Sequence, residues 1–246
     1  MKRVGLLLVL VLALLLAGSV WAAPLQSAPR IHVKDSTSSN WGGYAVLPLS
    51  KAQTFSDVKG SWIVPAVDCS TTPTSYSSYW VGIDGYSSNT VEQIGTDSDC
   101  SNGSAVYDAW YEMYPKYPVY ISMSVRPGDV INAEVQFLAN KKFQLTITDQ
   151  NSGASFSTIQ SSPSAKRTSA EWIAEAPSSG GVLPLANFGT VSFFNSSATS
   201  GSTIGSISNS AWKKDAIIMG TRDYNKAIPS ALSNNGTSFS VAWQHA

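Results

Sequence analysis

The amino-acid sequence predicts a single all-β domain, an antiparallel β-sandwich of two sheets. Its 246 residues suit one domain that buries a sizeable core. Many short runs alternate apolar and polar residues with a period of two, which is typical of half-buried strands. No segment keeps a 3.6-residue apolar period over a long stretch. Glycine, asparagine and serine separate the runs, as they do in sandwiches and barrels.

The first 22 residues predict a secretory signal peptide. Lys2 and Arg3 precede an apolar run over residues 4–16. Small residues follow, and Val20 and Ala22 fit the positions just before cleavage. A membrane anchor is the alternative, but the run is shorter than the roughly 20 residues that span a bilayer. We therefore expect cleavage and an extracellular protein.

The next segment, residues 23–38, predicts a leader or short pro-segment. It contains Pro24, Pro29 and few large apolar residues. Strand-like patterns begin at about Asn40, so we place the folded domain at residues 39–246. No internal repeat or linker divides this domain.

The middle of the domain predicts a three-stranded antiparallel meander. Residues 121–125, 131–137 and 143–149 each alternate apolar and polar side chains. Turn-forming residues separate them, at 126–129 and at 140–142. Further short β-type runs are expected at 62–64, 79–83, 106–113, 191–194, 216–219 and 239–243.

The charge of the chain limits the classes of partner. Charged residues make up 13% of the chain, about half the usual share. Serine, threonine, asparagine and glutamine must then cover much of the surface, which suits an acidic medium because few groups change charge there. Loss of Lys2 and Arg3 from the 16 basic residues leaves 14 against 16 acidic ones. We expect a monomer with no nucleic-acid partner and, after signal removal, no membrane partner.

Two cysteines, Cys69 and Cys100, lie in the domain. An even number in an exported chain favours one disulfide, and two buried thiols are the alternative. Two thiols are too few for a cysteine-rich metal site.

Histidine occurs only near the ends of the domain, at His32 and His245. Serine or cysteine nucleophiles of hydrolases need a rigidly held histidine, and catalytic zinc commonly needs two or three. Nucleotide-binding glycine motifs are also missing. An enzyme of this composition would work with carboxylates, amides, tyrosines or a main-chain site, and we expect no metal and no cofactor.

Two predicted strands carry tryptophan and carboxylate on one face. In the first strand this face holds Trp80, Gly82 and Asp84, and in the second it holds Asp108, Trp110 and Glu112. Aromatic walls with a few polar groups are typical of a ligand groove. Solvated faces with incidental tryptophans are the alternative.

Glu171 and Gln93 have no distinctive pattern of their own. Glu171 shares a face with Glu175 if residues 168–175 form a strand. A lone glutamate on a strand is more often solvated than catalytic, and a glutamine near a turn is commonplace. The residues by themselves indicate no reaction.

Eight segments, in order, resemble the glutamic peptidases, also called eqolisins. They cover most of the chain from Asn40 onward. The matching segments are Asn40-Trp-Gly-Gly-Tyr44, Gly60-Ser-Trp-Ile-Val-Pro65, Tyr79-Trp-Val-Gly-Ile-Asp-Gly85, Gln93-Ile-Gly-Thr-Asp97, Tyr107-Asp-Ala-Trp-Tyr-Glu112, Tyr114-Pro115, Ala170-Glu-Trp-Ile173 and Phe188-Gly-Thr-Val191.

The resemblance implies a fold, an activity and a set of site residues. The fold would be a concanavalin-like jelly roll, and the activity a metal-independent acid endopeptidase that acts on polypeptides and is insensitive to pepstatin. Glu171 would activate water, and Gln93 would donate a hydrogen bond to the oxyanion. The resemblance assigns substrate-binding positions to Trp80, Asp84, Asp108, Trp110 and Glu112, and a supporting position to Asp97.

One position departs from the family pattern beside the expected catalytic glutamine. Glu92 precedes Gln93 where an apolar residue is common. A negative charge there would raise the pKa of nearby acids.

Two other function classes fit the same sandwich, because fold does not fix function. The first is a secreted glycan-binding module or glycoside hydrolase. Trp80 and Trp110 would stack on sugar rings, and Glu171 with Glu112 would form an acid/nucleophile pair, whose carboxyls lie about 5–5.5 Å apart in retaining enzymes. The second is a catalytically inactive binding protein.

Overall fold

The computed structural model describes residues 32–34 and 37–246, and this part of the chain forms strands and loops with no helix. The strands are β1 (His32–Lys34), β2 (Thr37–Ser38), β3 (Trp41–Pro48), β4 (Phe55–Ile63), β5 (Ser78–Ile83), β6 (Val91–Ser101), β7 (Ser104–Tyr114), β8 (Val119–Ile121), β9 (Val130–Phe137), β10 (Lys142–Asp149), β11 (Ser155–Ser161), β12 (Ala170–Glu175), β13 (Thr190–Ser200), β14 (Thr203–Ser206), β15 (Trp212–Gly220), β16 (Asn225–Pro229) and β17 (Phe239–Trp243).

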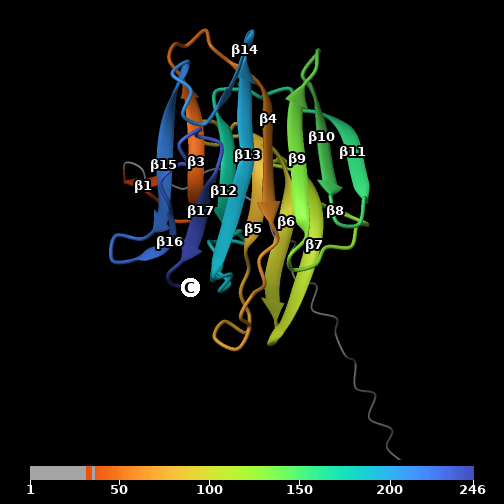
Figure 1. Cartoon of the computed structure of the whole chain (residues 1–246), viewed down its shortest axis with the longest axis vertical. Coiled ribbons are helices and arrows are strands. Elements are labelled where there is room, and N and C mark those ends of the chain that lie inside the picture. The colour runs from red at the N-terminus through yellow and green to blue at the C-terminus, as the bar shows by residue number, and fades with distance from the viewer. Residues whose placement is uncertain (1–31, 35–36) are drawn as a thin grey trace, which may run out of the picture.

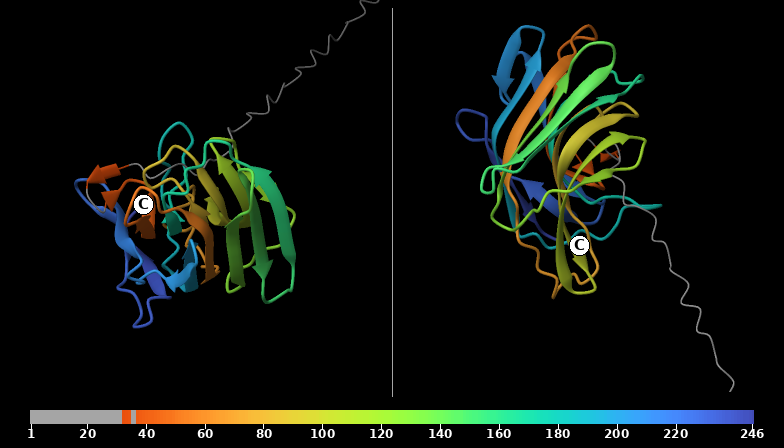
Figure 2. Two further views of the ribbon diagram at one scale, coloured as in Figure 1. Left: turned by 90° about the horizontal axis from the view of Figure 1, so that it is seen from above. Right: turned by 90° about the vertical axis from the view of Figure 1, so that its right-hand side faces the viewer.

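The strands form two layers, which Figure 2 shows from two sides. Sheet I has the order β15-β3-β12-β5-β6-β7-β8. Sheet II has the order β11-β10-β9-β4-β13-β17-β16, and β14 pairs with the far end of β13 (Figure 1). The long strand β15 joins the two layers, since its first part pairs with β3 and its last part with β16. Apart from a short parallel contact of β15 with β2, every pairing is antiparallel. The predicted two-sheet sandwich is confirmed.

The main core lies between the sheets and follows the two-residue period of the strands. In β5, Tyr79, Val81 and Ile83 are completely buried and belong to this core, as their alternation predicts. Large indoles fit because small residues face them. A Cβ atom on Gly60 would lie 2.7 Å from Cδ1 of Trp172, so glycine at this position makes room for the ring.

The predicted meander is partly wrong. β9, β10 and β11 do form a meander in sheet II, but residues 121–125 do not begin it. The strand there, β8, stops at Ile121 and pairs with β7 in sheet I. The alternating pattern continues through residues 122–125, where the chain leaves sheet I and enters β9 of sheet II. A segment that crosses between layers cannot keep a strand partner, so the local pattern is misleading here.

A tight hairpin sets the register of the two longest strands of sheet I. Asn102 and Gly103 connect β6 to β7 with φ angles of 51° and 81°. Positive φ at both central residues is the type I′ geometry that asparagine-glycine pairs favour. The two-residue turn places Ser101 opposite Ser104, and the same register then places Gln93 opposite Glu112.

Two predictions concern the N-terminal part and the cysteines. The signal peptide predicted at residues 1–22 and most of the predicted leader lie outside the described residues. Residues 32–34 and 37–38 form β1 and β2, so pairing begins before Asn40. The disulfide is confirmed: Cys69 and Cys100 are bonded, with 5.4 Å between their Cα atoms. It ties the loop before β5 to the end of β6.

Candidate active site

The expected catalytic residues lie in one row across sheet I. Glu171 on β12 stands opposite Gly82 on β5, which stands opposite Gln93 on β6, which stands opposite Glu112 on β7. Directly opposed residues of neighbouring antiparallel strands point to the same face of the sheet. This face is the outer one, because the alternate residues of the same strands fill the main core. All four residues are buried.

Gln93 and Glu171 are separated by a single strand. Two strand spacings of about 4.8 Å put their Cα atoms roughly 10 Å apart. The strand between them contributes Gly82, which has no side chain to fill the interval. A carboxylate and an amide therefore project from the same face of the sheet, on the two sides of a residue without a side chain.

Glu112 fixes the amide of Gln93. Gln93 Nε2 donates a hydrogen bond to Glu112 Oε2 over 2.7 Å. A primary amide has two N–H bonds, so one remains to donate to a ligand. No hydrogen bond joins Gln93 to Glu171 in the part of the chain that the structure describes. The partner of the glutamine is thus Glu112.

Tryptophans form the floor beside this row. Trp80 and Trp110 are both buried and belong to a second apolar cluster on the outer face of sheet I. Trp80 packs edge-on against Trp41, with 4.9 Å between ring centroids. Two buried carboxylates hold the indoles: Trp80 Nε1 donates to Glu175 Oε2 over 2.8 Å, and Trp110 Nε1 donates to Asp97 Oδ1 over 2.6 Å. These bonds fix both rings in place.

Asp84 has a different position from the one expected for a substrate contact. Its carboxylate accepts backbone N–H bonds from Lys166, Arg167 and Thr168 at 2.7–2.9 Å, and the Thr168 hydroxyl at 3.2 Å. Asp84 follows the end of β5 and has a φ of 73°, which turns it toward this segment. It therefore anchors the turn that leads into β12, the strand of Glu171.

Two aspartates further along β6, Asp97 and Asp99, have raised pKa values. Asp97 and Asp108 stand opposite each other, Asp97 buried and Asp108 exposed. Burial raises the pKa of Asp97 to about 7. Burial, with the charge of Asp97, also raises the pKa of Asp99 well above its usual value. In acid Asp97 is therefore protonated and adds no negative charge to the site.

Glu92 does not charge the site, contrary to the sequence-based expectation. It stands opposite Ile83, a core residue, so it points to the inner face of sheet I, away from Gln93. Burial raises its pKa to about 8, and its Oε1 accepts a hydrogen bond from Ser162 over 2.7 Å. Glu92 is therefore neutral in acid.

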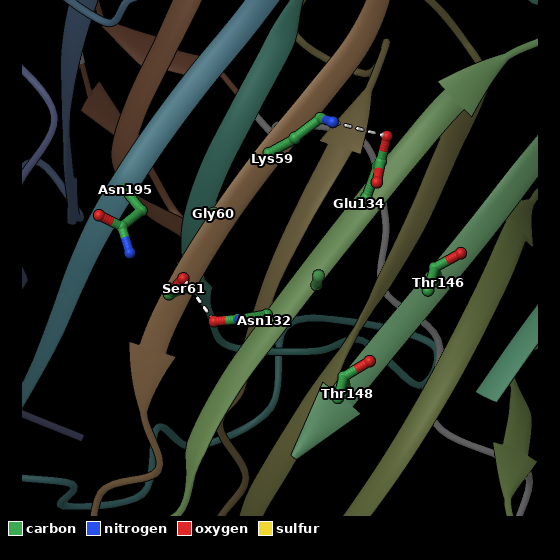
Figure 3. Close-up of a pocket in the computed structure, with 9 residues that line it drawn as sticks. Lys59, Gly60, Ser61, Asn132, Glu134, Thr146, Thr148 and Asn195 are labelled. Carbon is green, nitrogen blue, oxygen red and sulfur yellow. Dashed lines mark hydrogen bonds and ion pairs between the residues drawn. The ribbon is translucent and has the colours of Figure 1, made fainter. Parts of the chain in front are cut away.

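A separate hollow of about 290 Å³ lies on sheet II (Figure 3). Lys59 and Glu134 form an ion pair of 3.0 Å across it, and Ser61 donates a 2.7 Å hydrogen bond to Asn132. Its strands β4, β9, β10 and β13 belong to the other layer from the row of Glu171 and Gln93. These polar groups bond to one another and hold no pair suited to catalysis.

Two structural features of other protein classes are not found. Among the residues that the structure describes, no helix has the length and apolarity of a membrane span. Over the same residues, no three histidine, cysteine or acidic side chains gather as a metal site requires.

The profile of the Peptidase A4 family matches residues 39–243, so the chain belongs to the Peptidase A4 family. Over 193 residues it is 32% identical to Aspergillopepsin-2 of Aspergillus niger, a match that covers 68% of this chain and 67% of that protein. It is 33% identical over 163 residues to Scytalidopepsin B of Scytalidium lignicola, covering 63% and 59% of the two chains.

Solved structures agree with this assignment. The crystal structure of scytalido-glutamic peptidase with a transition state analog inhibitor matches with a TM-score of 0.72 at 25% identity, over 84% of this chain and 98% of that one. The resemblance to the glutamic peptidases is confirmed.

Sequence reasoning missed two contacts of the site. It treated Glu112 only as a groove residue, although the Asn102–Gly103 turn signals the register that puts Glu112 beside Gln93. It also gave Glu175 no partner, whereas Glu175 holds Trp80 and accepts a 3.2 Å hydrogen bond from Asn40. No local pattern signals the second contact, because Glu175 and Trp80 lie far apart in the chain.

Proposed function

We propose that this chain is a secreted acid endopeptidase in which Glu171 is the general base and Gln93 the oxyanion donor. The observation that carries the proposal is the row of Glu171, Gly82 and Gln93. It sets a carboxylate and an amide on one face of the sheet, on the two sides of a glycine, in a chain of a peptidase family. The substrates would be polypeptides.

Apart from the substrate, the proposed reaction uses one water molecule and the side chains of this protein. Glu171 takes a proton from water while the water oxygen bonds to the scissile carbonyl carbon. The carbonyl π electrons move to its oxygen, and the second N–H of Gln93 donates to this oxyanion. Glu171 then passes its proton to the nitrogen, the C–N bond breaks, and a carboxylic acid and an amine leave.

The buried acids favour operation at low pH. Once Glu171 takes up a proton it cannot act as a base, so activity should fail in strong acid. In mild acid Asp97 stays protonated, since its pKa is about 7, and Trp110 keeps a neutral partner. From ordinary carboxyl pKa values near 4 we expect an optimum between about pH 2 and 5.

Because Glu171 and Gln93 are buried, a substrate reaches them only when this face is uncovered.

The glycosidase alternative is not favoured by the geometry. Glu171 and Glu112 stand three strand spacings apart, about 14 Å between Cα atoms. The side chain of Gln93 lies between them and bonds to Glu112. A retaining pair needs carboxyls about 5–5.5 Å apart with no group between them.

Digestion of denatured casein from pH 2 to 7 tests the proposed activity. The protein is assayed alone, with pepstatin, and with a metal chelator. We expect cleavage in acid that neither additive reduces. Pepstatin sensitivity would assign the activity to paired aspartates, and loss with chelator would assign it to a metal. Absence of cleavage at every pH by folded protein would contradict the proposal.

Export is tested separately. The predicted signal peptide and the Cys69–Cys100 bond, a bond typical of oxidising compartments, support it. Protein recovered from the medium of expressing cells should begin at Ala23 or later by N-terminal sequencing. Retention of residues 1–22 on a cell-associated protein would favour a membrane anchor.

A further inference from the structure

The backbone conformation of residue 82 does not require glycine. Its φ angle is not among the positive values that favour glycine, in contrast to that of Gly85 three residues later, at 102°. Glycine in the interior of a strand also weakens the strand, by roughly 0.5–1 kcal/mol against alanine. Some other requirement must account for glycine in the centre of β5.

Gly82 lies between the two expected catalytic residues in the row on the outer face of sheet I. A Cβ atom on Gly82 would point to the outer face, where it would lie 3.1 Å from Gln93 Cβ and 2.8 Å from Trp80 Cζ3. Glu171 stands opposite on the next strand. Gly82 thus has Gln93 on one side, Glu171 on the other, and the edge of the Trp80 ring close to the position that its Cβ would take.

We propose that the scissile peptide group of the substrate binds over Gly82, which makes Gly82 a positioning residue for the reaction. This inference rests on the function proposed above and deepens it. The flat peptide group lies against the bare backbone of Gly82, with its carbonyl oxygen toward Gln93 and its carbon within reach of the water held by Glu171. Any side chain on residue 82 lifts the substrate by about one C–C bond, roughly 1.5 Å. Misplacement by 1 Å can cost about 100-fold in rate.

Gly95, a further glycine of this face, has a different task. A Cβ on Gly95 would lie 2.3 Å from the Tyr79 carbonyl oxygen and 2.6 Å from Trp80 Cβ. Gly95 therefore accommodates β5 and the base of the Trp80 side chain. It stands in the next row, between Trp80 and Trp110, and not between the catalytic residues.

The substitution Gly82→Ala tests the proposal, with Gly42→Ala as the matched control. Gly42 is a buried glycine of the same sheet, and its added Cβ would meet Met219 Cβ at an ordinary 3.4 Å. We expect Gly82→Ala to fold, by circular dichroism and thermal midpoint, and to lose at least about 100-fold in kcat with a smaller change in KM. Gly42→Ala should match the wild type. A folded Gly82→Ala protein whose kcat stays within threefold of wild type would overturn the proposal.

A second pair of variants separates binding of the peptide group over Gly82 from simple crowding of Trp80. Phenylalanine at position 80 lacks the outer ring atoms that the new methyl group would strike. Trp80→Phe is compared with Trp80→Phe/Gly82→Ala, a comparison that also decides the matter if Gly82→Ala alone folds poorly. We expect the double variant to be at least about 100-fold slower than Trp80→Phe. Equal rates would mean that Gly82 only makes room for Trp80, and would overturn the proposal.

The results that would contradict the proposed function differ from those that would contradict the role of Gly82. A wild type without peptidase activity, or an active Glu171→Gln protein, contradicts the function. An inactive Glu171→Gln protein together with a fully active Gly82→Ala protein contradicts only the role of Gly82.

Discussion

Gln93 is a neutral side chain whose direction is set by a buried carboxyl group. Glu112 accepts one of its N–H bonds over 2.7 Å, and the second N–H remains for another acceptor. Replacing Gln93 with alanine removes this donor. One oxyanion donor contributes about 10²–10³ in kcat where it has been measured.

We therefore expect Gln93→Ala to lower kcat by about 100-fold or more, with KM nearly unchanged, in steady-state assays on a peptide substrate. Gln136→Ala is the control, because Gln136 lies on sheet II against Asp57, outside the site. A folded Gln93→Ala protein with wild-type kcat would remove the amide from the mechanism.

At the scale of elements, β12 carries Glu171, and Asp84 fixes the turn that leads into β12. The carboxylate of Asp84 gathers three backbone N–H groups of the turn at residues 166–168. Asp84→Ala would leave these donors without their acceptor, at a cost of about 2–3 kcal/mol in the free energy of unfolding. Urea unfolding measures this loss.

The control for Asp84→Ala is Asp223→Ala, at an aspartate whose side chain is 77% exposed in a surface ion pair. It should change the free energy of unfolding by less than about 0.5 kcal/mol. Equal stability of the Asp84 and Asp223 variants would show that the turn does not depend on this anchor.

The disulfide acts on the loop that precedes β5. Cys69 and Cys100 are 31 residues apart in sequence, so breaking the bond frees a long loop in the unfolded chain. The double variant Cys69→Ser/Cys100→Ser should lose about 3–4 kcal/mol in the free energy of unfolding. Urea titration of both proteins under non-reducing conditions measures the difference. Two alkylatable thiols in the native wild type would contradict the bond itself.

Local sequence patterns predicted which segments form strands better than they predicted which strands pair. The alternation in residues 79–83 gave the correct inner and outer faces of β5. The same reasoning extended β8 to residue 125, because periodicity carries no information about where a chain leaves its sheet. It also could not place β12 between β3 and β5, since these pairings join segments that lie far apart in the chain. The family resemblance supplied Glu171 and Gln93 where the pattern alone could not.

At the scale of the whole molecule, the buried acids make stability depend on pH. The pKa of Glu92 is raised by burial from 4.5 to about 8, and that of Asp97 from 3.8 to about 7. Well below pH 4 both groups are protonated in the folded and the unfolded chain. Above it, the unfolded chain releases these protons first, so the folded state loses stability as the pH rises toward 8.

We expect the free energy of unfolding to be greatest in acid and to fall between about pH 4 and 8. Each such group contributes a slope of at most about 1.4 kcal/mol per pH unit within its window. Glu92→Gln keeps an oxygen for Ser162 but removes one titrating group, so its profile should be flatter. Urea unfolding at pH 4, 6 and 8 measures both profiles. A wild type that becomes more stable toward pH 8 would contradict this picture of the buried acids.

The most direct test of the proposed mechanism is the single-turnover rate of peptide cleavage by Glu171→Gln at the pH optimum. Glutamine keeps the shape of the side chain but cannot take a proton from water. We predict a folded protein with hydrolysis at background. Adding Gln93→Ala should slow it little further, because base and donor serve one transition state. A folded Glu171→Gln protein that cleaves peptides near the wild-type rate would contradict the assignment of Glu171 as the base.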